Sequence, residues 1–345
     1  PAKYRSSGNS YNSKQRMNKN SIIEASVKKE ALAEGQPSAA TPGAQNLERR
    51  AQLRRLIFAT VILILCFSKP LYDLARYVLK SALYSHVLLI PFVSLYLVWI
   101  RRGVSIPTSA PARAWAVIPL ALGSGSVALY WIALNADWTL RRNDTLALTT
   151  LSFISFFVGA CVIFLGRRTL RSVAFPLGFL LFMVPFPTFV ENGIETFFQH
   201  TSAAAAHAMI TMAGTPLFRD GLSFQLPGVR LLVASECSGI RSSLVLLITS
   251  LIAGKLFLRS PWKRAILALA VIPLGIIRNG FRIFTIAELC VHISPDMLDS
   301  FIHRRGGPVF FLLSLIPFFL LLILLRKMDS PAKPLSQTKV IEAKI

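Results

Sequence analysis

The sequence predicts an all-α polytopic membrane protein, and its composition and its apolar runs both indicate this class. Of its 345 residues, 53% are hydrophobic and only 16% are charged, and the mean hydropathy is +0.55. Apolar runs of about 18 residues or more recur, each long enough as a helix to cross ~30 Å of hydrocarbon. The formal charge of +22 comes from bases at the ends of these runs and in one tail. Such charge orients a membrane protein, so we expect no nucleic-acid partner.

The predicted order along the chain is tail, membrane domain, tail. Residues 1–52 are rich in Ser, Asn, Lys and Ala without apolar periodicity, which predicts a disordered basic cytoplasmic tail. A multi-spanning membrane domain is expected over 53–327, and a short cytoplasmic tail over 328–345. The domain should contain about eight transmembrane helices, at 56–72, 82–100, 114–134, 145–165, 173–190, 240–258, 265–289 and 308–325. Lys69-Pro70 interrupts the first of them.

The distribution of Lys and Arg predicts the orientation. Segments 101–113, 166–172 and 255–264 hold several bases and no acid, whereas acids collect in the segments between them. Because a basic excess marks the cytoplasmic side, both termini should be cytoplasmic, in a multi-pass protein of the plasma (inner) membrane.

One segment between the fifth and sixth spans is long enough to carry structure of its own. Residues 191–213 predict an amphipathic or shallow extracytoplasmic helix. Asp220-Gly221 and Pro227-Gly228 are turn signals, so residues 217–234 predict a small hairpin that leads the chain to Cys237.

Cys237 lies in a polar run immediately before a strongly apolar segment, which is not how a core cysteine is placed. The run is Ser235-Glu236-Cys237-Ser238-Gly239-Ile240-Arg241-Ser242-Ser243. Ser235 or Ser238 is expected to cap the following helix, and the glycine allows close approach of the backbone. The helix dipole and Arg241 favour the thiolate, while Glu236 opposes it unless it is paired. The alternative is a polar helix start without a reactive thiol.

The other cysteines suggest no disulfide scaffold. Cys66 and Cys161 lie inside apolar runs, where cysteine behaves as a small hydrophobe. Cys290 is expected at the outer end of a helix, so a Cys237–Cys290 disulfide stays an alternative to a free thiol.

Arg282 is expected inside the seventh span, ~10 Å below its outer end at Leu289. Arg278 lies one turn deeper, and Asn279 shares a face with Arg282. A guanidinium inside the bilayer marks a functional site unless it forms a buried ion pair.

His303 enters the eighth span from the outer side, beside two arginines. Alone it would be a solvated loop residue, and the histidines show no zinc-type spacing with cysteines or acids, so no metal or other cofactor is expected. Topology nevertheless places Cys237, Arg282 and His303 near the same outer surface. A thiol, a fixed cation and a base are the groups that a cysteine transpeptidase needs.

Five sequence blocks carry a resemblance to a known family. Three are Glu236-Cys237-Ser238-Gly239-Ile240-Arg241-Ser242, Asn279-Gly280-Phe281-Arg282, and His303 followed by Gly306-Gly307 and Phe310. The others are Ser85-His86-Val87-Leu88-Leu89-Ile90-Pro91 before Arg101-Arg102, and Phe175-Pro176 through Pro185-Phe186-Pro187. Over about residues 80–325 the chain resembles the exosortase/archaeosortase family.

The resemblance implies a polytopic enzyme that cuts and transfers secreted proteins. Their C-terminal sorting signal has a short motif such as Pro-Glu-Pro, an apolar helix and a basic cluster. The family's catalytic residues map onto Cys237, Arg282 and His303. We expect Glu236, Ser238, Gly239, Arg241 and Asn279 to support catalysis or bind substrate, at a site on the extracytoplasmic side. The expected partners are secreted proteins with this signal and membrane lipid. The alternative is a non-catalytic transporter or flippase-like bundle that uses Arg278 and Arg282 to bind an anionic lipid or solute.

Overall fold

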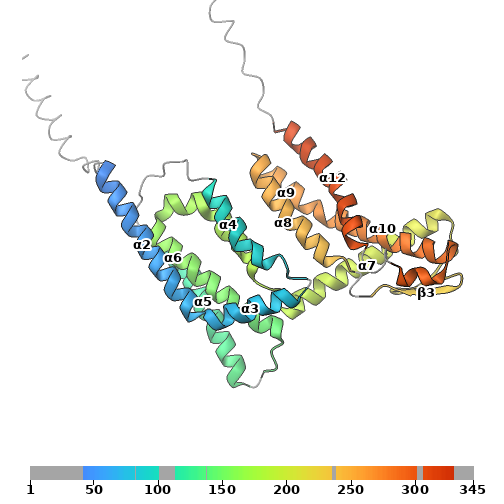
Figure 1. Ribbon diagram of the computed structural model, residues 1–345, viewed down its shortest axis with the longest axis horizontal. Helices are drawn as coiled ribbons and strands as arrows, with labels where there is room; N and C mark the ends of the chain where they lie inside the picture. The colour runs from blue at the N-terminus through green and yellow to red at the C-terminus, as the bar shows by residue number, and fades with distance from the viewer. Residues whose placement is uncertain are drawn as a thin grey trace, which may run out of the picture.

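The computed structural model describes residues 42–81, 83–100, 113–136, 138–234, 238–300 and 306–329 (Figure 1). The first elements are helix α2 (Pro42–Cys66), α3 (Ser68–Lys80), the 3₁₀ turn η1 (Val87–Leu89), α4 (Ile90–Trp99) and α5 (Arg113–Asn135). Helix α5 coincides with the predicted span 114–134. Helix α2 begins inside the segment expected to be a tail. It bends by 71° into α3, where Lys69-Pro70 interrupts the apolar run and proline removes a backbone donor.

Helix α6 (Arg142–Phe179) is a single helix of 38 residues. It contains the predicted span 145–165 and the beginning of the predicted span 173–190, which is therefore not a separate straight helix. The 3₁₀ turn η2 (Leu180–Met183) ends it, and α7 (Thr188–Ala213) follows at an angle of 89°. Pro185 and Pro187 lie at this corner, where each fixes φ and removes a helix donor.

A small sheet follows α7 in place of the single hairpin expected there. Strands β1 (Phe218–Asp220), β2 (Ser223–Leu226) and β3 (Val229–Leu232) pair antiparallel in the order β1-β2-β3. Gly221 (φ 59°) and Gly228 (φ 76°) make the two turns in the left-handed region. Phe224 and Leu231 from the sheet are buried with side chains of α7 and of the later helix α10 (Val271–His292).

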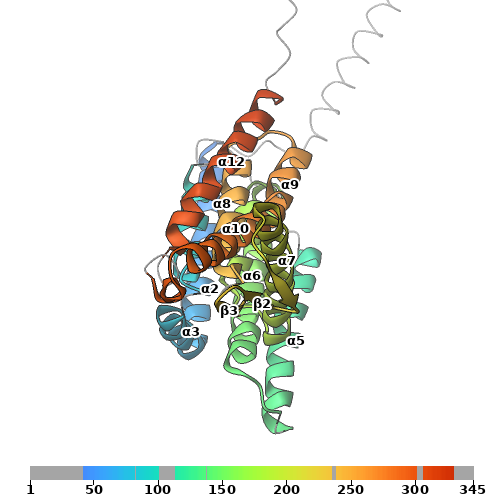
Figure 2. The same cartoon turned by 90° about the vertical axis from the view of Figure 1, so that its right-hand side faces the viewer.

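The remaining elements are α8 (Ile240–Phe257), α9 (Pro261–Leu269), α10 (Val271–His292), the 3₁₀ turn η4 (Pro295–Asp299) and α12 (Gly307–Lys327). Figure 1 shows them as a second group of helices beside α2–α6, with α7 leading from one group to the other. Residues 261–292 form a path of 32 residues, which at ~1.5 Å per residue exceeds a ~30 Å hydrocarbon layer. Figure 2 looks onto α7, α10 and the sheet.

The expected count of eight spans is not confirmed by the described residues. In the part of the chain that the structure describes, five helices are long and apolar enough to cross a membrane, or up to seven if each bent pair counts as one span. Residues 82–100 yield only a short apolar helix, Val87–Trp99. Prolines lie at both bends: Pro70 follows the break between α2 and α3, and Pro185 and Pro187 lie between η2 and α7. The protein is a multi-pass membrane protein.

Polar contacts fix the beginning of α7 to the first helix group. The Glu191 carboxylate accepts hydrogen bonds from the Tyr84 hydroxyl (2.9 Å) and from the Asn143 amide. Asp144 accepts from the backbone N–H of Thr188 (2.7 Å) and from its hydroxyl (3.0 Å). The α6–α7 corner is therefore held at both carboxylates.

The opposite ends of α8 and α12 are joined by Asp329. Its carboxylate accepts from the backbone N–H groups of Arg259 and Ser260 and from Nζ of Lys263 at 3.1 Å. The Arg259 N–H is the largest cause that lowers the pKa of Asp329. The turn between α8 and α9 is thus attached to the last residues of the described chain.

Candidate active site at the start of helix α8

Helix α8 begins at a glycine that lies directly against α10. Gly239 occupies the N-cap position with φ 75° and ψ 10°, a left-handed conformation. A Cβ added to it would stand 2.9 Å from Cγ and 3.0 Å from Oδ1 of Asn279, whose side chain is buried. Both the backbone conformation and the lack of space require glycine here.

Arg278 holds the same turn from the side of α10. Its Nη2 donates to the Gly239 carbonyl (3.1 Å) and to the Ser243 hydroxyl (3.1 Å). The same carbonyl accepts from the Ser242 hydroxyl (3.0 Å) and from the Ser243 backbone N–H (3.1 Å). Arg278 is only 8% exposed, and its Nη1 has no hydrogen-bond partner among the described residues.

The contacts between α8 and α10 place Arg282 just beyond the first residue of α8. Gly239 meets Asn279, and a Cβ on Gly275 would stand 2.6 Å from the hydroxyl of Ser243. From Gly239 to Ser243 the chain of α8 advances by four residues, while the contacted position in α10 moves back from Asn279 to Gly275. The two helices are therefore antiparallel. Arg282 lies three residues past Asn279, so it is ~4.5 Å further toward the sheet. It is half-buried, and its Nε is buried.

The beginning of α12 reaches the same level of α10. The Phe310 ring packs edge-on against the Phe281 ring, with 6.1 Å between centroids, and Phe310 is buried. Gly306 is the N-cap of α12. Arg282 therefore lies next to Phe281 at the level where α12 begins, and one turn beyond the start of α8.

The structure describes some of the predicted site residues and not others. Glu236, Cys237 and His303 lie outside the described residues. Ser238 is 1% exposed, and Gly239 and Asn279 are in contact. Arg241 is exposed on the first turn of α8. The prediction that Ser238 caps helix α8 is wrong. Gly239 occupies the N-cap position, and no side chain caps the helix there.

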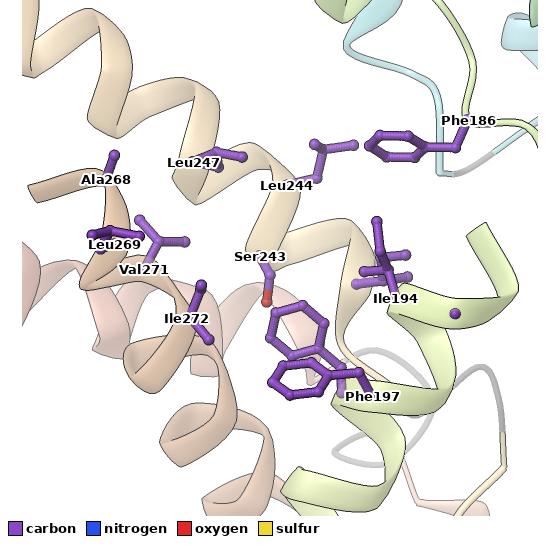
Figure 3. Close-up of a pocket in the computed structure, with 13 residues that line it drawn as sticks. Phe186, Ile194, Phe197, Ser243, Leu244, Leu247, Ala268, Leu269, Val271 and Ile272 are labelled. Carbon is purple, nitrogen blue, oxygen red and sulfur yellow. The ribbon is translucent and has the colours of Figure 1, made fainter. Parts of the chain in front are cut away.

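An apolar cavity of about 450 Å³ lies beside this turn. Figure 3 shows side chains of α7, α8 and the α9–α10 junction facing one another around it. Ser243 is polar, and the other described residues that line it are apolar or glycine. They are Phe186, Gly193, Ile194, Phe197, Phe198, Ile240, Leu244, Leu247, Ala268, Leu269, Val271 and Ile272.

Sequence reasoning missed the roles of Ser243 and Gly275 and the contact of Arg278. The sequence predicts Arg278 as an intramembrane cation but not its partners, which lie 39 and 35 residues away in the chain. The available signal was a glycine one helical turn before that arginine, on the same face of α10.

Comparison with known families decides the assignment. Residues 76–320 match the family described as transmembrane exosortase. The chain belongs to the transmembrane exosortase family. The match covers most of the chain and includes α8, α10 and the beginning of α12. No curated protein and no solved structure matches the sequence. Membership supports a membrane transpeptidase or protease role in general for this exosortase.

Proposed function

We propose that this exosortase is a cysteine endopeptidase and transpeptidase that cleaves the C-terminal sorting signal of secreted proteins on the extracytoplasmic side. It transfers them through a thioester to an acceptor. The proposal rests mainly on one observation: the starts of α8 and α12 both meet α10 beside Arg282.

Chain connectivity supports the assignment of the two other catalytic residues. Cys237 precedes Gly239 by two residues, and His303 precedes Gly306 by three. Because a residue spans at most ~3.6 Å, the backbone tethers them within about 7 Å and 11 Å of those helix starts. A thiol, an imidazole and a guanidinium can then act on one carbonyl group.

The proposed reaction begins with attack of the Cys237 thiolate on the scissile carbonyl carbon. Arg282 stabilises the tetrahedral oxyanion, and one such donor contributes roughly 3–4 kcal/mol. Collapse breaks the C–N bond while His303 gives a proton to the leaving amine. His303 then takes a proton from the acceptor amine or other nucleophile, which attacks the thioester and releases the thiolate. Water is the default acceptor.

The membrane position fits a substrate whose signal contains an apolar helix and a basic end. The apolar part lies among the enzyme's helices and surrounding lipid, and the basic end stays cytoplasmic. The start of α2 and the end of α12 lie at the same end of the molecule in Figures 1 and 2. This arrangement supports our proposal that both termini are cytoplasmic and that the active site faces the other side.

The transporter alternative gains no specific support. One Nη of Arg278 is engaged with Gly239 and Ser243, and the described lining of the cavity beside it carries no charged side chain. An anionic headgroup would find no cation in that cavity. We therefore retain the enzyme as the proposed function.

The deciding experiment uses a secreted reporter that ends in Pro-Glu-Pro, an apolar segment of about 20 residues and an Arg-rich end. We expect Cys237→Ala to abolish its cleavage without loss of membrane insertion. Cys237→Ser should be nearly as inactive, because a hydroxyl is far less ionised than a thiol. Cys66→Ala is the matched control and should cleave normally. Cleavage by Cys237→Ala at the wild-type rate would refute the mechanism.

A second control addresses the disulfide alternative. Cys290 is buried between α10 and the sheet. If Cys290→Ala abolished cleavage as fully as Cys237→Ala while the protein still inserted, a required disulfide would replace the free-thiol mechanism.

A further inference from the structure

We propose that Arg278 is a positioning residue for the nucleophile, because it fixes the peptide group of Gly239 from which the chain leads back to Cys237. This inference rests on the proposed function. It assigns to Arg278 a role separate from that of Arg282, which acts on the substrate's oxyanion.

The first step of the argument is the number of donors on one carbonyl. The Gly239 carbonyl accepts from Nη2 of Arg278, from the Ser242 hydroxyl and from the Ser243 N–H. Two of these donors belong to α8 itself, so they move with the helix. Arg278 is the donor that belongs to another helix, and it therefore ties the turn to α10.

The second step is the conformational freedom of glycine. Gly239 has a left-handed backbone, and without a Cβ it could rotate to other conformations at little cost. External contacts must remove this freedom. Asn279 fills the space at its Cα, and Nη2 of Arg278 would lie 3.2 Å from an added Cβ. The turn is held on both its Cα and its carbonyl.

The third step is the direction of the chain before the turn. Ser238 is 1% exposed, so it is enclosed by the protein, beside the half-buried Gly239. Residue 237 is joined to α8 through these two residues alone. Nucleophilic attack needs the reacting atoms about 3–3.5 Å apart, and small misplacements lower the rate strongly. Holding Ser238 and Gly239 in place therefore favours catalysis, and this gain offsets the desolvation cost of burying the Arg278 guanidinium.

A lysine should not replace this arginine. One nitrogen of the planar guanidinium donates to two acceptors at 3.1 Å each. The ammonium of a lysine is a compact, strongly hydrated point charge on a shorter side chain, and it lacks the planar arrangement of donors. Arg278→Lys therefore preserves charge but loosens the turn. This separates positioning from electrostatic activation of the thiol.

The test measures steady-state cleavage of the sorting reporter in proteoliposomes, together with the alkylation rate of Cys237 by iodoacetamide as a function of pH. For Arg278→Lys we expect kcat to fall about tenfold and KM to stay within about threefold. The alkylation profile should match the wild type, because alkylation by a small reagent needs the thiolate but not its alignment with a substrate. A shift of that profile large enough to explain the lost rate would instead assign Arg278 an electrostatic role and overturn the proposal.

Arg264→Lys is the matched control at the other end of α8. Arg264 donates from Nε (2.9 Å) and Nη2 (2.7 Å) to the Leu258 carbonyl. It therefore binds a carbonyl at the C-terminal end of α8 in the same manner, away from the site. We expect wild-type kcat for Arg264→Lys. An equal fall in both variants would mean that Arg278 serves helix packing only, against the proposal.

Ser243→Ala tests the Arg278 contact without altering a buried charge, in case Arg278→Lys does not insert. It removes the hydroxyl that binds Nη2 of Arg278 together with the Gly239 carbonyl, and kcat should fall about threefold at unchanged KM. Wild-type kcat in this variant, or in Arg278→Lys, would overturn the proposal. The proposed function fails on a different result, since it requires that the wild type cleaves and that Cys237→Ala does not.

Discussion

Gly239 lies so close to Asn279 that a methyl group added at its Cα would stand 2.9 Å from the Asn279 Cγ. The contact brings the N-cap of α8 against the middle of α10. It forms within the membrane domain, where the helix start of α8 and the polar residues of α10 enclose each other. The space left for the side chain at position 239 is that of a hydrogen atom.

We expect Gly239→Ala to lower both activity and stability. The left-handed backbone costs alanine about 1–2 kcal/mol, and the clash with buried Asn279 adds to this. Gly221→Ala is the matched control, because Gly221 has φ +59° and nothing within 4 Å of its added Cβ. Thermal unfolding in detergent and reporter cleavage should both show the larger loss for Gly239→Ala. Equal losses in the two variants would contradict a close-packed turn.

Topology predicts opposite labelling on the two sides of the membrane. A cysteine introduced at Ser105, in a basic inner segment, should resist an impermeant maleimide in intact cells. Gln225→Cys should react, because Gln225 is exposed on β2, which we place outside. Labelling is read site by site by mass spectrometry. Reaction at position 105 without reaction at 225 would reverse the orientation and with it the location of the site.

The Asp329 contacts predict a pH-dependent attachment of α12. Hydrogen bonds, chiefly from the Arg259 N–H, lower the pKa of Asp329 below its ordinary value. A group with a lowered pKa stabilises the fold above its unfolded-state pKa, about 3.9, and loses that contribution as the pH falls through the folded value. Wild type should therefore unfold at a higher temperature than Asp329→Asn near pH 6, and the difference should shrink below about pH 3.9 and vanish below the lowered folded-state pKa. Asp220→Asn, at an exposed position, should show no such difference. A gap that persists at the lowest pH would contradict this linkage.

Apolar length was a good predictor where the helices are straight. Helices α5, α8 and α12 coincide with predicted spans because each of these apolar segments forms one continuous helix. It failed at residues 82–100 and 173–190, where prolines shorten or bend the helices and hydropathy does not register the change in direction. The prediction of a single hairpin was also incomplete, since the turns at Gly221 and Gly228 produce three strands.

Part of the candidate site could be anticipated from single residues, and part could not. Gly239, Asn279 and Arg282 stood out because glycine, amide and guanidinium are unusual in apolar runs. The bond from Arg278 to Gly239 depends on the register of α8 against α10, which no local pattern encodes. Ser243 looked like an ordinary helix serine because only its neighbour on α10 reveals a partner.

The last prediction concerns Arg282, where charge alone would suggest that lysine is an adequate substitute. A guanidinium offers five donors in a planar fork, whereas an ammonium is more strongly hydrated and loses its proton more readily when desolvated. Arg282 is half-buried beside the start of α8, so a lysine there would deprotonate or reach toward water and leave the oxyanion position empty. We expect Arg282→Lys to lose cleavage on the order of a hundredfold or more, as for loss of one oxyanion donor. The loss should exceed the roughly tenfold loss of Arg278→Lys. Reporter cleavage in proteoliposomes measures both, and wild-type rates in Arg282→Lys would reduce the residue to a general positive charge and remove its oxyanion role.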